Sequence, residues 1–600
     1  MSERREDLRQ SLSGGADQES LSRRRFLGAS AAFGASTAIS PAAMAWTRLA
    51  PGTTAPSLPR LPDFPAAITL IQESFENWSG GIEQDSVWTC QPKDHREAVL
   101  VANWAASHGY ALRTRGYAHN WSPLVISDES IHPGSSRAKL LLIDLRQHMS
   151  SMQMASGAGS SVIVDAGASM EELLAFLETN GCGVTSCPAP GDLTIGGVLA
   201  IDGHGTGVPA DGETRLPGQT FGSISNRVLS LTVIAWDAQK SAYRTRVISR
   251  TDPLMRALSV SLGRTIILEA TLRVEQNQNL RCQSYIDVPS SEMFAAPGSG
   301  GRTLASYIDD SGRVEAIWYP FTDNPWLKVW TVTPNKPWFS REVDSPYNYP
   351  FSDNISEEAS DLIEQIVNGA AGLTPLFGEV MYSTTVLGLL FNGSYDLWGP
   401  SRNLLQYVQP TTLRVTANGY AILTRRDKIQ DVLHRFVEQY ESQLQAYADQ
   451  GKYPINGPVE LRVTGLDESA DADLAGAQDA ALSALLPRED HPDWDVAVWL
   501  DLLTIPGTEY SAEFYTEFEQ WLYAEFSEDE AAVRVEWSKG WGYSEAGPWT
   551  SSAVMRREVP ESLTLGRPAN EGWDDALESL DSLDPHGLFR NVFLDKLMRR

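Results

Sequence analysis

The stretch RGYAHNW at residues 115–121 places an arginine, a glycine and a histidine in one short loop after an apolar run. A turn that begins Arg-Gly lets several backbone N–H groups converge on an anion. The ring of His119 offers a nucleophilic nitrogen, so His119 is a candidate cofactor tether. An ordinary surface histidine is the alternative, and the rest of the chain must decide between the two.

Two glycine-rich segments follow at residues 187–197 and 202–207. Glycines let the backbone press against a flat or phosphorylated ligand where side chains would collide. Their spacing fits neither the G-x-G-x-x-G dinucleotide pattern nor the Walker loop, and a structural hairpin is the alternative. His204 is a second candidate tether, but its neighbouring glycines favour a backbone-binding role.

Charged residues interrupt apolar patterns in the second half of the chain, at Glu315, Glu460, Arg462, Asp501 and Lys539. The strand period of two sends Glu460 and Arg462 to one face, so both can reach the same cavity. Asp501 interrupts an apolar run, where an acid must be paired or protonated, and such acids often mark functional sites. A solvent-facing ion pair is the alternative for Glu460 and Arg462.

Alternating helices and strands must position these residues. Asp94 and Glu97 predict a capped helix that ends at Gly109, and Ser169 and Glu172 predict a second, which ends near residue 180. A further helix is predicted over residues 252–262. A long helix is predicted over residues 428–448, with apolar residues at core spacing. The predicted strands cover residues 110–114, 140–145, 161–164, 228–236, 245–249, 264–274, 313–319, 413–415 and 459–464.

The composition excludes some functions. The 600 residues carry a formal charge of −29, which would repel nucleic acid and anionic lipid headgroups at long range. The acidic residues are expected on a solvated surface, and dense acidic stretches such as residues 467–473 are expected in loops or exposed turns. The four cysteines lack the spacing of a zinc site, so no metal is predicted; buried thiols are expected, with a single disulfide as the alternative.

Residues 1–45 are similar to a twin-arginine signal peptide, with SRRRFL at residues 22–27 and a small-residue cleavage site before Trp46. The apolar part is interrupted by Gly, Ser and Pro, which makes it a poor membrane span. We therefore expect a bacterial protein that is exported in the folded state, with its cofactor in place, to the periplasm or the extracellular medium.

The order of the motifs resembles the FAD-binding domain of the vanillyl-alcohol oxidase superfamily. The motifs are RG-x-x-H at residues 115–119, GHG at residues 203–205 and GRTIILEATL at residues 263–272, and the likeness resumes with DPHGLFRN at residues 584–591. The resemblance implies an α+β two-domain flavoprotein. Its FAD-binding (PCMH-type) domain would cover residues 46–277, and an α+β substrate (cap) domain with an antiparallel sheet would cover residues 278–565. Residues 566–600 would return to the FAD-binding domain.

The same resemblance implies that FAD is attached covalently, through a bond between the His119 ring and the flavin 8α-methyl group. The other residues implied to contact FAD are Arg115, Gly116, Tyr117, Ala118, Asn120, Pro190, Gly191, Leu193, Thr194, Gly196, Gly197, Gly203, His204, Gly207, Gly263, Ile267 and Asn591.

Segments at residues 313–322, 456–462, 491–497 and 537–541 are together similar to bacterial cholesterol oxidases with covalently bound FAD (type II). This implies oxidation of the 3β-hydroxyl of cholesterol by hydride transfer to flavin, reduction of O₂ to H₂O₂, and isomerisation of the Δ5 double bond to Δ4. We assign Arg462 and Lys539 to electrostatic stabilisation and Glu315 and Glu460 to acid/base chemistry, with Glu460 and Arg462 as a switchable gate for oxygen. Those enzymes have an amide where Asp501 stands, so its role is not transferred.

Two other functions stay open. The Glu-x-Arg strand followed by Trp-x-Lys also resembles the alditol and aldonolactone oxidases, which would keep the flavin and change the substrate. An exported binding protein without enzymatic activity is the alternative of another class. For the sterol oxidase, the expected partners are cholesterol and O₂, with transient contact to sterol-containing membranes; the sequence does not predict the oligomeric state.

Overall fold

The computed structural model describes residues 58–127, 139–156, 159–353, 357–409, 412–527 and 529–598, so the predicted signal peptide lies outside the described residues. The first sheet has the strand order β1-β2-β4-β3 (Thr69–Glu76, Glu83–Gln91, Leu140–Asp144 and Ala111–Arg115). Helix α3 (His95–His108) begins as predicted, because the Asp94 side chain accepts the N–H of Glu97, and it ends at Gly109 with φ 68°. Strand β3 leads directly into the histidine loop.

The second sheet has the order β5-β6-β10-β8-β9 (Met152–Met154, Ser161–Asp165, Ile266–Arg273, Val228–Asp237 and Ala242–Ser249). Helix α4 (Met170–Thr179) has the predicted capping box. The helix predicted over residues 252–262 is wrong in length, since α6 covers only Met255–Leu258. The chain turns away through Leu262 (φ 52°) and Gly263 (φ 71°), both in the left-handed region. The short elements of this part are α5 (Ile195–Ala200), η4 (Ile224–Arg227), β7 (Cys182–Gly183) and β11 (Glu275–Gln276).

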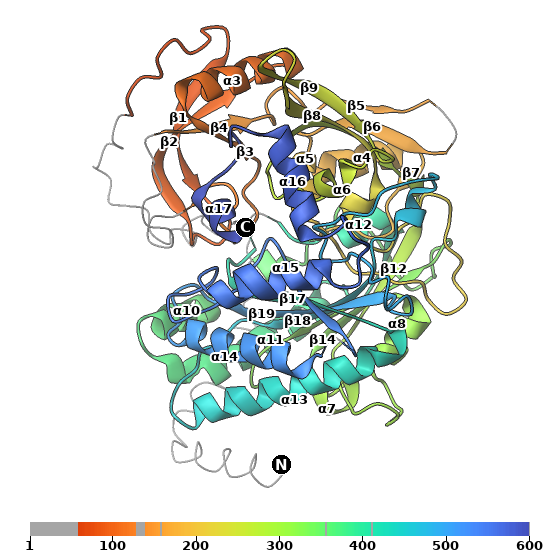
Figure 1. The fold of residues 1–600 in the computed structure, drawn as a ribbon. Coiled ribbons are helices and arrows are strands. Elements are labelled where there is room, and N and C mark those ends of the chain that lie inside the picture. The colour runs from red at the N-terminus through yellow and green to blue at the C-terminus, as the bar shows by residue number, and fades with distance from the viewer. Residues whose placement is uncertain are drawn as a thin grey trace. The chain divides into compact units, whose positions relative to one another are not determined.

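The third sheet has nine strands in the order β15-β16-β12-β14-β13-β18-β19-β17-β20, and Figure 1 shows its central strands. All pairs are antiparallel except β15 with β16, which confirms the antiparallel sheet predicted for the second half. The strand predicted at residues 413–415 is wrong, because β17 begins at Thr416, opposite the last residue of β19, Thr504. The strands are β12 (Asn279–Tyr285), β13 (Arg313–Trp318), β14 (Trp326–Val332), β15 (Arg341–Glu342), β16 (Asp396–Pro400), β17 (Thr416–Thr424), β18 (Val459–Gly465), β19 (Val496–Thr504) and β20 (Ala532–Val535).

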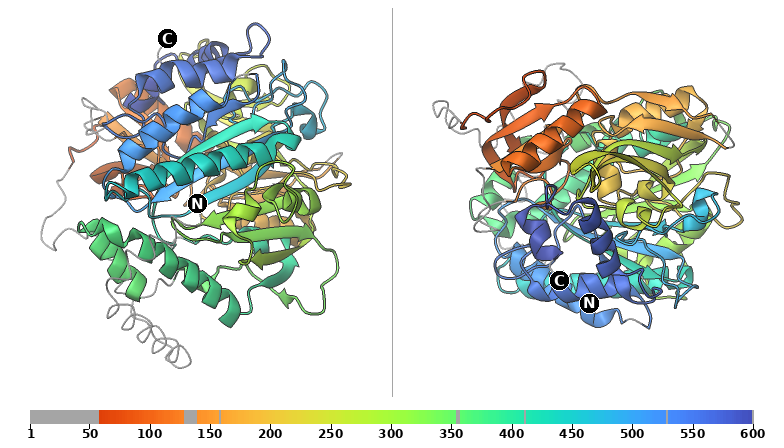
Figure 2. Two further views of the ribbon diagram at one scale, coloured as in Figure 1. Left: turned by 90° about the horizontal axis from the view of Figure 1, so that it is seen from below. Right: turned by 45° about the horizontal axis from the view of Figure 1, so that its top comes forward.

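Helices α13 (Ile429–Ala448) and α14 (Ser511–Glu525) lie side by side below this sheet in Figure 1, and the view from below in Figure 2 shows the same arrangement. The apolar residues of α13, among them Phe436 and Tyr440, are buried as predicted. The remaining helices of the second half are α7 (Ser290–Met293), α8 (Leu304–Ser311), α9 (Pro350–Asp353), α10 (Glu357–Val367), η5 (Ala371–Leu373), α11 (Thr374–Phe391), α12 (Ser401–Leu405), η6 (Arg426–Lys428), η7 (Ser469–Ala472), η8 (Val554–Glu558) and α15 (Val559–Thr564).

Helix α11 differs from the other helices in its surface. With the turn before it, residues 371–391, it is long and apolar enough to cross a membrane by length and composition, and only 28% of that window is buried. Leu376, Leu390 and Phe391 are exposed. An exposed apolar helix of this kind is unusual for a protein surface and marks a candidate contact surface.

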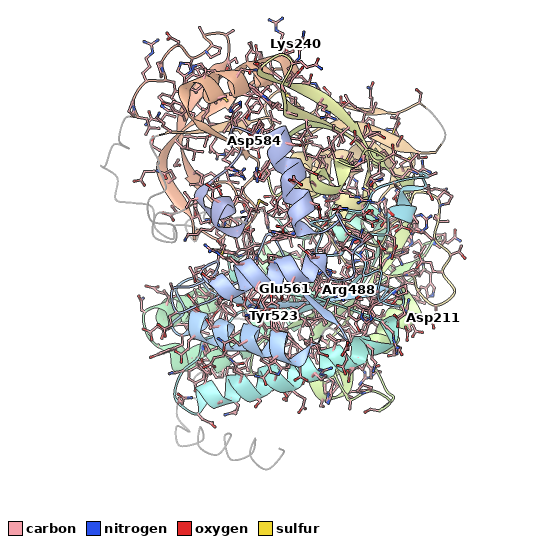
Figure 3. All side chains as sticks on the ribbon, in the orientation of Figure 1. Asp211, Lys240, Arg488, Tyr523, Glu561 and Asp584 are labelled. Carbon is pink, nitrogen blue, oxygen red and sulfur yellow. The ribbon has the colours of Figure 1, made fainter. Side chains whose placement is uncertain are left out.

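The C-terminal segment contacts the two N-terminal sheets. The helices here are α16 (Trp573–Leu583) and α17 (Val592–Leu597). Asp584, labelled in Figure 3, accepts the hydroxyl of Tyr243 on β9 at 2.5 Å and the N–H groups of Leu588 and Phe589. The N–H of Leu112 on β3 donates to the Leu588 carbonyl. Chain positions more than 300 residues apart therefore share one hydrogen-bonded network.

Two expectations about burial have different outcomes. The four cysteines are free thiols and buried, as expected. The solvent exposure expected for the acidic residues of 467–473 is wrong at Asp467, which has no exposed surface. Its carboxyl accepts hydrogen bonds from Ser223 and Ser483, and these replace the water that an acidic side chain otherwise needs.

Candidate active site

A cavity of about 380 Å³ brings the histidine loop and the charged strands together. Its walls come from β3 and the loop after it, from the glycine-rich segments, from β13 and β18, and from the loop after β20. The predicted residues that line it are Arg115, Gly116, Tyr117, Ala118, His119, Asn120, Pro190, Leu193, Thr194, Gly196, Gly197, Gly203, His204, Gly263, Ile267, Glu315, Glu460, Arg462 and Lys539.

Four predicted residues lie behind the walls: Gly191, Gly207, Asp501 and Asn591. The N–H of Gly207 donates to the Val463 carbonyl, and the Asn591 side chain donates to the Leu124 carbonyl. The Gly191 carbonyl accepts the N–H of Glu171. These three residues therefore hold wall segments in place rather than facing the cavity.

The histidine loop is held by contacts from distant parts of the chain. Ala118 has φ 57°, which a residue with a side chain rarely adopts. The Asn77 side chain donates to the Asn120 carbonyl at 3.0 Å, and the Trp121 N–H donates to the Ser538 carbonyl at 2.8 Å. Surrounding structure of this kind fixes a strained backbone, and strained backbone is concentrated at functional sites.

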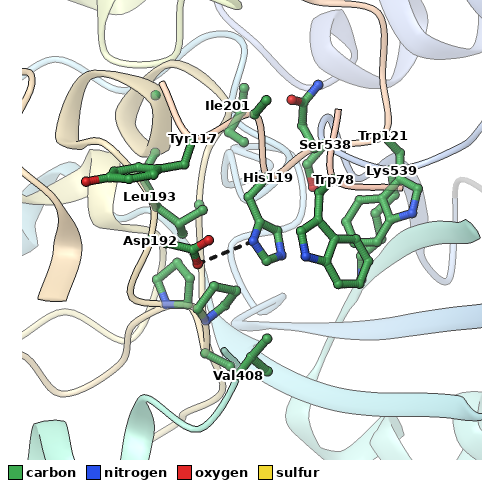
Figure 4. Close-up of a pocket in the computed structure, with 18 of the residues that line it drawn as sticks. Trp78, Tyr117, His119, Trp121, Asp192, Leu193, Ile201, Val408, Ser538 and Lys539 are labelled. Carbon is green, nitrogen blue, oxygen red and sulfur yellow. Dashed lines mark ion pairs between the residues drawn. The ribbon is translucent and has the colours of Figure 1, made fainter. Parts of the chain in front are cut away.

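The His119 side chain is 7% exposed and lies between Trp78 and Asp192 (Figure 4). The Trp78 indole stacks on it, with ring centroids 4.8 Å apart and planes inclined by 16°. Its Nδ1 lies 3.5 Å from Asp192 Oδ1, and neither atom has a hydrogen-bond partner among the described residues. Sequence reasoning missed both Trp78 and Asp192. An acidic residue within a glycine-rich segment could have indicated Asp192, but no comparable feature of the sequence indicated Trp78.

Steric packing of the wall segments is a second reason for glycine at these positions, besides the close approach of a ligand. A Cβ on Gly116 would lie 2.6 Å from Thr194 Oγ1, and a Cβ on Gly203 would lie 2.2 Å from a methyl carbon of Val198. Both are closer than real Cβ contacts. The glycines therefore also let the wall segments pack against each other.

His204 contributes its side chain as well as its backbone, which differs from the expectation. Its ring stacks on Trp499 with centroids 3.6 Å apart, and its Nε2 lies 3.6 Å from Glu536 Oε1. Glu536, which sequence reasoning missed, also lies 3.1 Å from the Lys539 ammonium. His204 is thereby connected to the charged half of the cavity.

Antiparallel pairing aligns the predicted charged residues. The register places Glu315 opposite Arg462 and Glu460 opposite Asp501. Arg462 Nη1 lies 3.5 Å from both Glu315 Oε1 and Glu460 Oε2, while Nη2 donates to Asp501. Lys539 Nζ donates to the same Asp501 oxygen. Asp501 therefore acts as the common acceptor of two cations.

A glycine makes room for this cluster. Gly419 on β17 stands opposite Asp501 on β19. A Cβ at Gly419 would lie 2.8 Å from Asp501 Oδ1, 2.9 Å from Glu536 Oε2 and 2.7 Å from the Lys539 side chain. The absence of a side chain on β17 is therefore a condition for the ion pairs.

Glu315 has two further partners that sequence reasoning missed. Tyr407 donates its hydroxyl to Glu315 Oε2 at 2.6 Å, and the ammonium of Lys328, which has no exposed surface, lies 3.3 Å from the same oxygen. Lys328 also lies 2.9 Å from the centre of the Tyr407 ring and 4.8 Å from that of Trp330. The presence of a lysine in the otherwise apolar sequence of β14 could have indicated Lys328 as a functional residue.

The two glutamates have opposite protonation tendencies. Burial opposes ionisation of Glu315, but Lys328 and Arg462 outweigh it and hold its pKa below the ordinary value. Burial raises the pKa of Glu460 above the ordinary value, and Arg462 offsets this only in part. A site with two acids whose pKa values are pushed apart has one fixed anion and one group able to exchange a proton.

The rest of the cavity wall next to the charged cluster is largely apolar. It is lined by Ile317, Tyr319, Trp326, Phe351, Met381, Leu413, Val415 and Leu503. Apolar walls with a few convergent polar groups suit a hydrophobic ligand that has one reactive polar group.

Family comparisons agree with this geometry. The model described as cholesterol oxidase, substrate-binding matches residues 279–599, and the model described as FAD binding domain matches residues 88–238. This chain belongs to the cholesterol oxidase family. A solvent-stable cholesterol oxidase of known structure is 54% identical, with a TM-score of 0.88, and the match covers 90% of this chain and 100% of that one. The cholesterol oxidase from Brevibacterium sterolicum is 41% identical with the same TM-score and coverage. The domain boundaries predicted at residues 277 and 565 stay predictions.

A more distant relative points to the wider superfamily. A D-arabinono-1,4-lactone oxidase from Candida glabrata is 22% identical over 250 residues. The match covers 41% of this chain and 42% of that relative, so the chain spans less than half of its length.

FAD is the cofactor of this cholesterol oxidase family member, and the residues present fit it. The FAD-binding match includes the histidine loop and both glycine-rich segments. Buried polar atoms without partners among the described residues, Trp78 Nε1, His119 Nδ1 and Asp192 Oδ1, belong to this half of the cavity. A large ligand with many donors and acceptors would satisfy such atoms.

Proposed function

We propose that this protein is an exported, FAD-dependent cholesterol oxidase that converts a 3β-hydroxysteroid to the Δ4-3-ketone and reduces O₂ to H₂O₂. The observation that carries the proposal is one cavity in which the His119 loop, a buried cluster of acids and cations, and apolar walls meet. Export by the twin-arginine route rests on the sequence of residues 22–27 alone.

The charged cluster supplies what alcohol oxidation requires. Bound FAD would accept the hydride from C3 and pass the electrons to O₂. The hydroxyl proton must go to a base, and Glu460 lines the cavity with Arg462 as its one close cationic partner among the described residues. Arg462 and Lys539 place positive charge where negative charge develops on the substrate oxygen, and Asp501 holds both cations in position.

Isomerisation needs a group that takes a proton from C4 and returns it at C6. Glu460 suits this role because burial raises its pKa, so its carboxylate, once it has released the hydroxyl proton, is a stronger base that can take a proton and return it. Glu315 accepts from Tyr407 and pairs with Lys328 and Arg462, so it is better suited to remain an anion that fixes Arg462. Oxygen gating by Glu460 and Arg462 is compatible with their 3.5 Å contact, which a small side-chain rotation would break.

The first test concerns the substrate. We expect cholesterol to be oxidised with stoichiometric peroxide release, and alditols and aldonolactones to be turned over far more slowly, because the cavity has apolar walls beside the charged cluster. Steady-state rates over the two substrate panels, with peroxide detection, decide this. Preferential turnover of a lactone, the substrate class in the name of the yeast relative, would reject the sterol proposal. A colourless purified protein would favour a binding protein without enzymatic activity.

The second test concerns the tether. In His119→Ala, we expect FAD to remain bound under native conditions but to leave the protein on acid precipitation, because the ring that would carry the covalent bond is gone. Absorbance of pellet and supernatant measures this. His204→Ala is the matched control, since His204 lines the same cavity, and its pellet should stay yellow. Release of flavin from His204→Ala alone would contradict the assignment.

The third test separates the two acids. We expect Glu460→Gln to lower kcat for oxidation and isomerisation by about 100-fold or more, the usual contribution of a general acid or base. The pKa of Glu460 is raised, so wild-type kcat/KM should rise with pH through a midpoint above that of an ordinary glutamate, and the variant should lack this limb.

Glu315→Gln and Glu513→Gln complete this test. Glu315→Gln should slow the reaction, because Arg462 loses one of its anionic partners. The rise of kcat/KM with pH should remain. Glu513, on the exposed side of α14, should be neutral to substitution. Full oxidation and isomerisation rates in both Glu315→Gln and Glu460→Gln would show that the acid/base assignment is wrong.

The fourth test concerns the membrane that holds the sterol. We propose that α11 contacts it, because the helix exposes Leu390 and Phe391 while Met381 and Thr385 of the same helix line the cavity. The net charge favours neutral lipid. The double variant Leu390→Ser and Phe391→Ser should lower turnover of cholesterol in phosphatidylcholine vesicles and leave turnover of detergent-solubilised cholesterol unchanged. Val247→Ser, at an equally exposed apolar site on β9, is the control; equal effects of both would refute the contact.

A further inference from the structure

A second buried acid cluster lies at the flavin side of the cavity. Asp202 lines the cavity, is 3% exposed and has φ 63°, in the left-handed region. Asp202 Oδ2 accepts the N–H of Ala484 at 2.8 Å and contacts Ser483 Oγ at 2.8 Å. Asp202 Oδ1 is buried without a hydrogen-bond partner among the described residues. The proposed mechanism makes no use of this residue.

The Ser483 hydroxyl lies between two carboxyl groups. Its oxygen is 2.8 Å from Asp202 Oδ2 and 2.7 Å from Asp467 Oδ2. A hydroxyl has one proton, so it donates to only one of these oxygens. The other short contact requires a proton carried by the second carboxyl group. The geometry therefore requires one protonated acid in the pair.

The surroundings indicate which acid holds the proton. Asp467 accepts the N–H of Ser223 at 2.7 Å and its hydroxyl at 2.8 Å, in addition to Ser483. Asp202 has one backbone donor, from Ala484. Negative charge is better stabilised where more donors converge, which places it on Asp467.

The charged groups around the pair support the same assignment. Burial, followed by the Asp467 carboxylate, raises the pKa of Asp202 well above its ordinary value. Arg250 attracts Asp467 across the interior while its own guanidinium donates to Asn226, and Arg534 donates to the Ser483 carbonyl. Arg250 thus acts on the Asp467 side of the pair.

We propose that Asp202 is a neutral carboxylic acid whose Oδ1 accepts a hydrogen bond from an N–H or O–H group of the FAD bound in the cavity. Its own proton is donated to Ser483, which in turn donates to Asp467. This positioning contact concerns the FAD-loaded chain, and it holds whichever alcohol is the substrate.

Protonation is tested without cofactor chemistry. Asp202→Asn keeps a neutral group and suits the left-handed backbone, since asparagine adopts positive φ more readily than most residues. Infrared difference spectra should show the C=O band of a protonated carboxyl group in the wild type and not in Asp202→Asn. An unchanged band pattern would overturn the proposal.

The pH dependence of stability is an independent readout. Because the pKa of Asp202 is raised in the folded state, the folded protein keeps a proton that the unfolded chain releases above about pH 4. This group therefore makes the protein less stable as pH rises above that value. Asp202→Asn should lose this decline, measured as the difference in denaturation midpoint between about pH 5 and about pH 8. Parallel wild-type and variant curves would contradict a protonated Asp202.

The contact with FAD is tested in a His119→Ala background, where the cofactor is expected to exchange. Asp202→Gly removes the carboxyl without straining the positive φ, and it should weaken FAD binding by about five-fold to ten-fold, the loss expected for one hydrogen bond. Asp202→Asn retains an oxygen acceptor and should bind within about two-fold of the parent. Equal affinity of the glycine variant and the parent would show that Asp202 does not contact FAD. If Asp202→Gly does not fold, Asp202→Asn provides the test. A large loss of its affinity for FAD would reject the proposal that Asp202 is a neutral hydrogen-bond acceptor for FAD.

Discussion

Compensation of buried charge is the constraint on which the substrate side of this protein depends. Glu315, Arg462, Asp501 and Lys539 lie in an interior where an unpaired charge would destabilise the fold by several kcal/mol. The pairing register of β13, β18 and β19 brings Glu315, Arg462 and Asp501 together, the loop after β20 adds Lys539, and Gly419 leaves the volume they need. Because Arg462, Asp501 and Lys539 each share their partners with other charges, the cluster behaves as one unit.

The backbone carbonyl of Ser538 is one connection between this unit and the cofactor side. The Ser538 carbonyl accepts the N–H groups of Trp121 and Ser122, at the end of the loop that carries His119. The next residue is Lys539, which donates to Asp501. A shift of the loop after β20 would therefore move the proposed tether and the proposed catalytic cation together. The two halves of the cavity keep their spacing through this short connection.

The sequence predicted features with local causes. The N-cap of α3, the capping box of α4 and the shared face of Glu460 and Arg462 follow from spacing alone, and the order of the glycine motifs was specific enough to indicate FAD. Features that depend on pairing between distant segments were not predictable. To predict the stacking of Trp78 on His119, or the aromatic rings next to Lys328, one must know which distant segments are neighbours. Only the unusual residue type, such as a lysine in an apolar strand, was visible in advance.

Asp467 shows why a charge-rich stretch is an uncertain guide to exposure. An acidic run favours solvent on average, yet Asp467 is buried because Ser223 and Ser483 supply the donors that water would supply. The chain thus buries acids in two ways. Near the substrate it compensates them with lysine and arginine, which provides the positive charge that we propose stabilises a developing oxyanion. Near the flavin the donors are hydroxyl and backbone groups, with no lysine or arginine paired directly to Asp202 or Asp467 among the described residues, and this arrangement favours a retained proton instead. The difference in partner type therefore follows the different chemistry required at the two ends of one cavity.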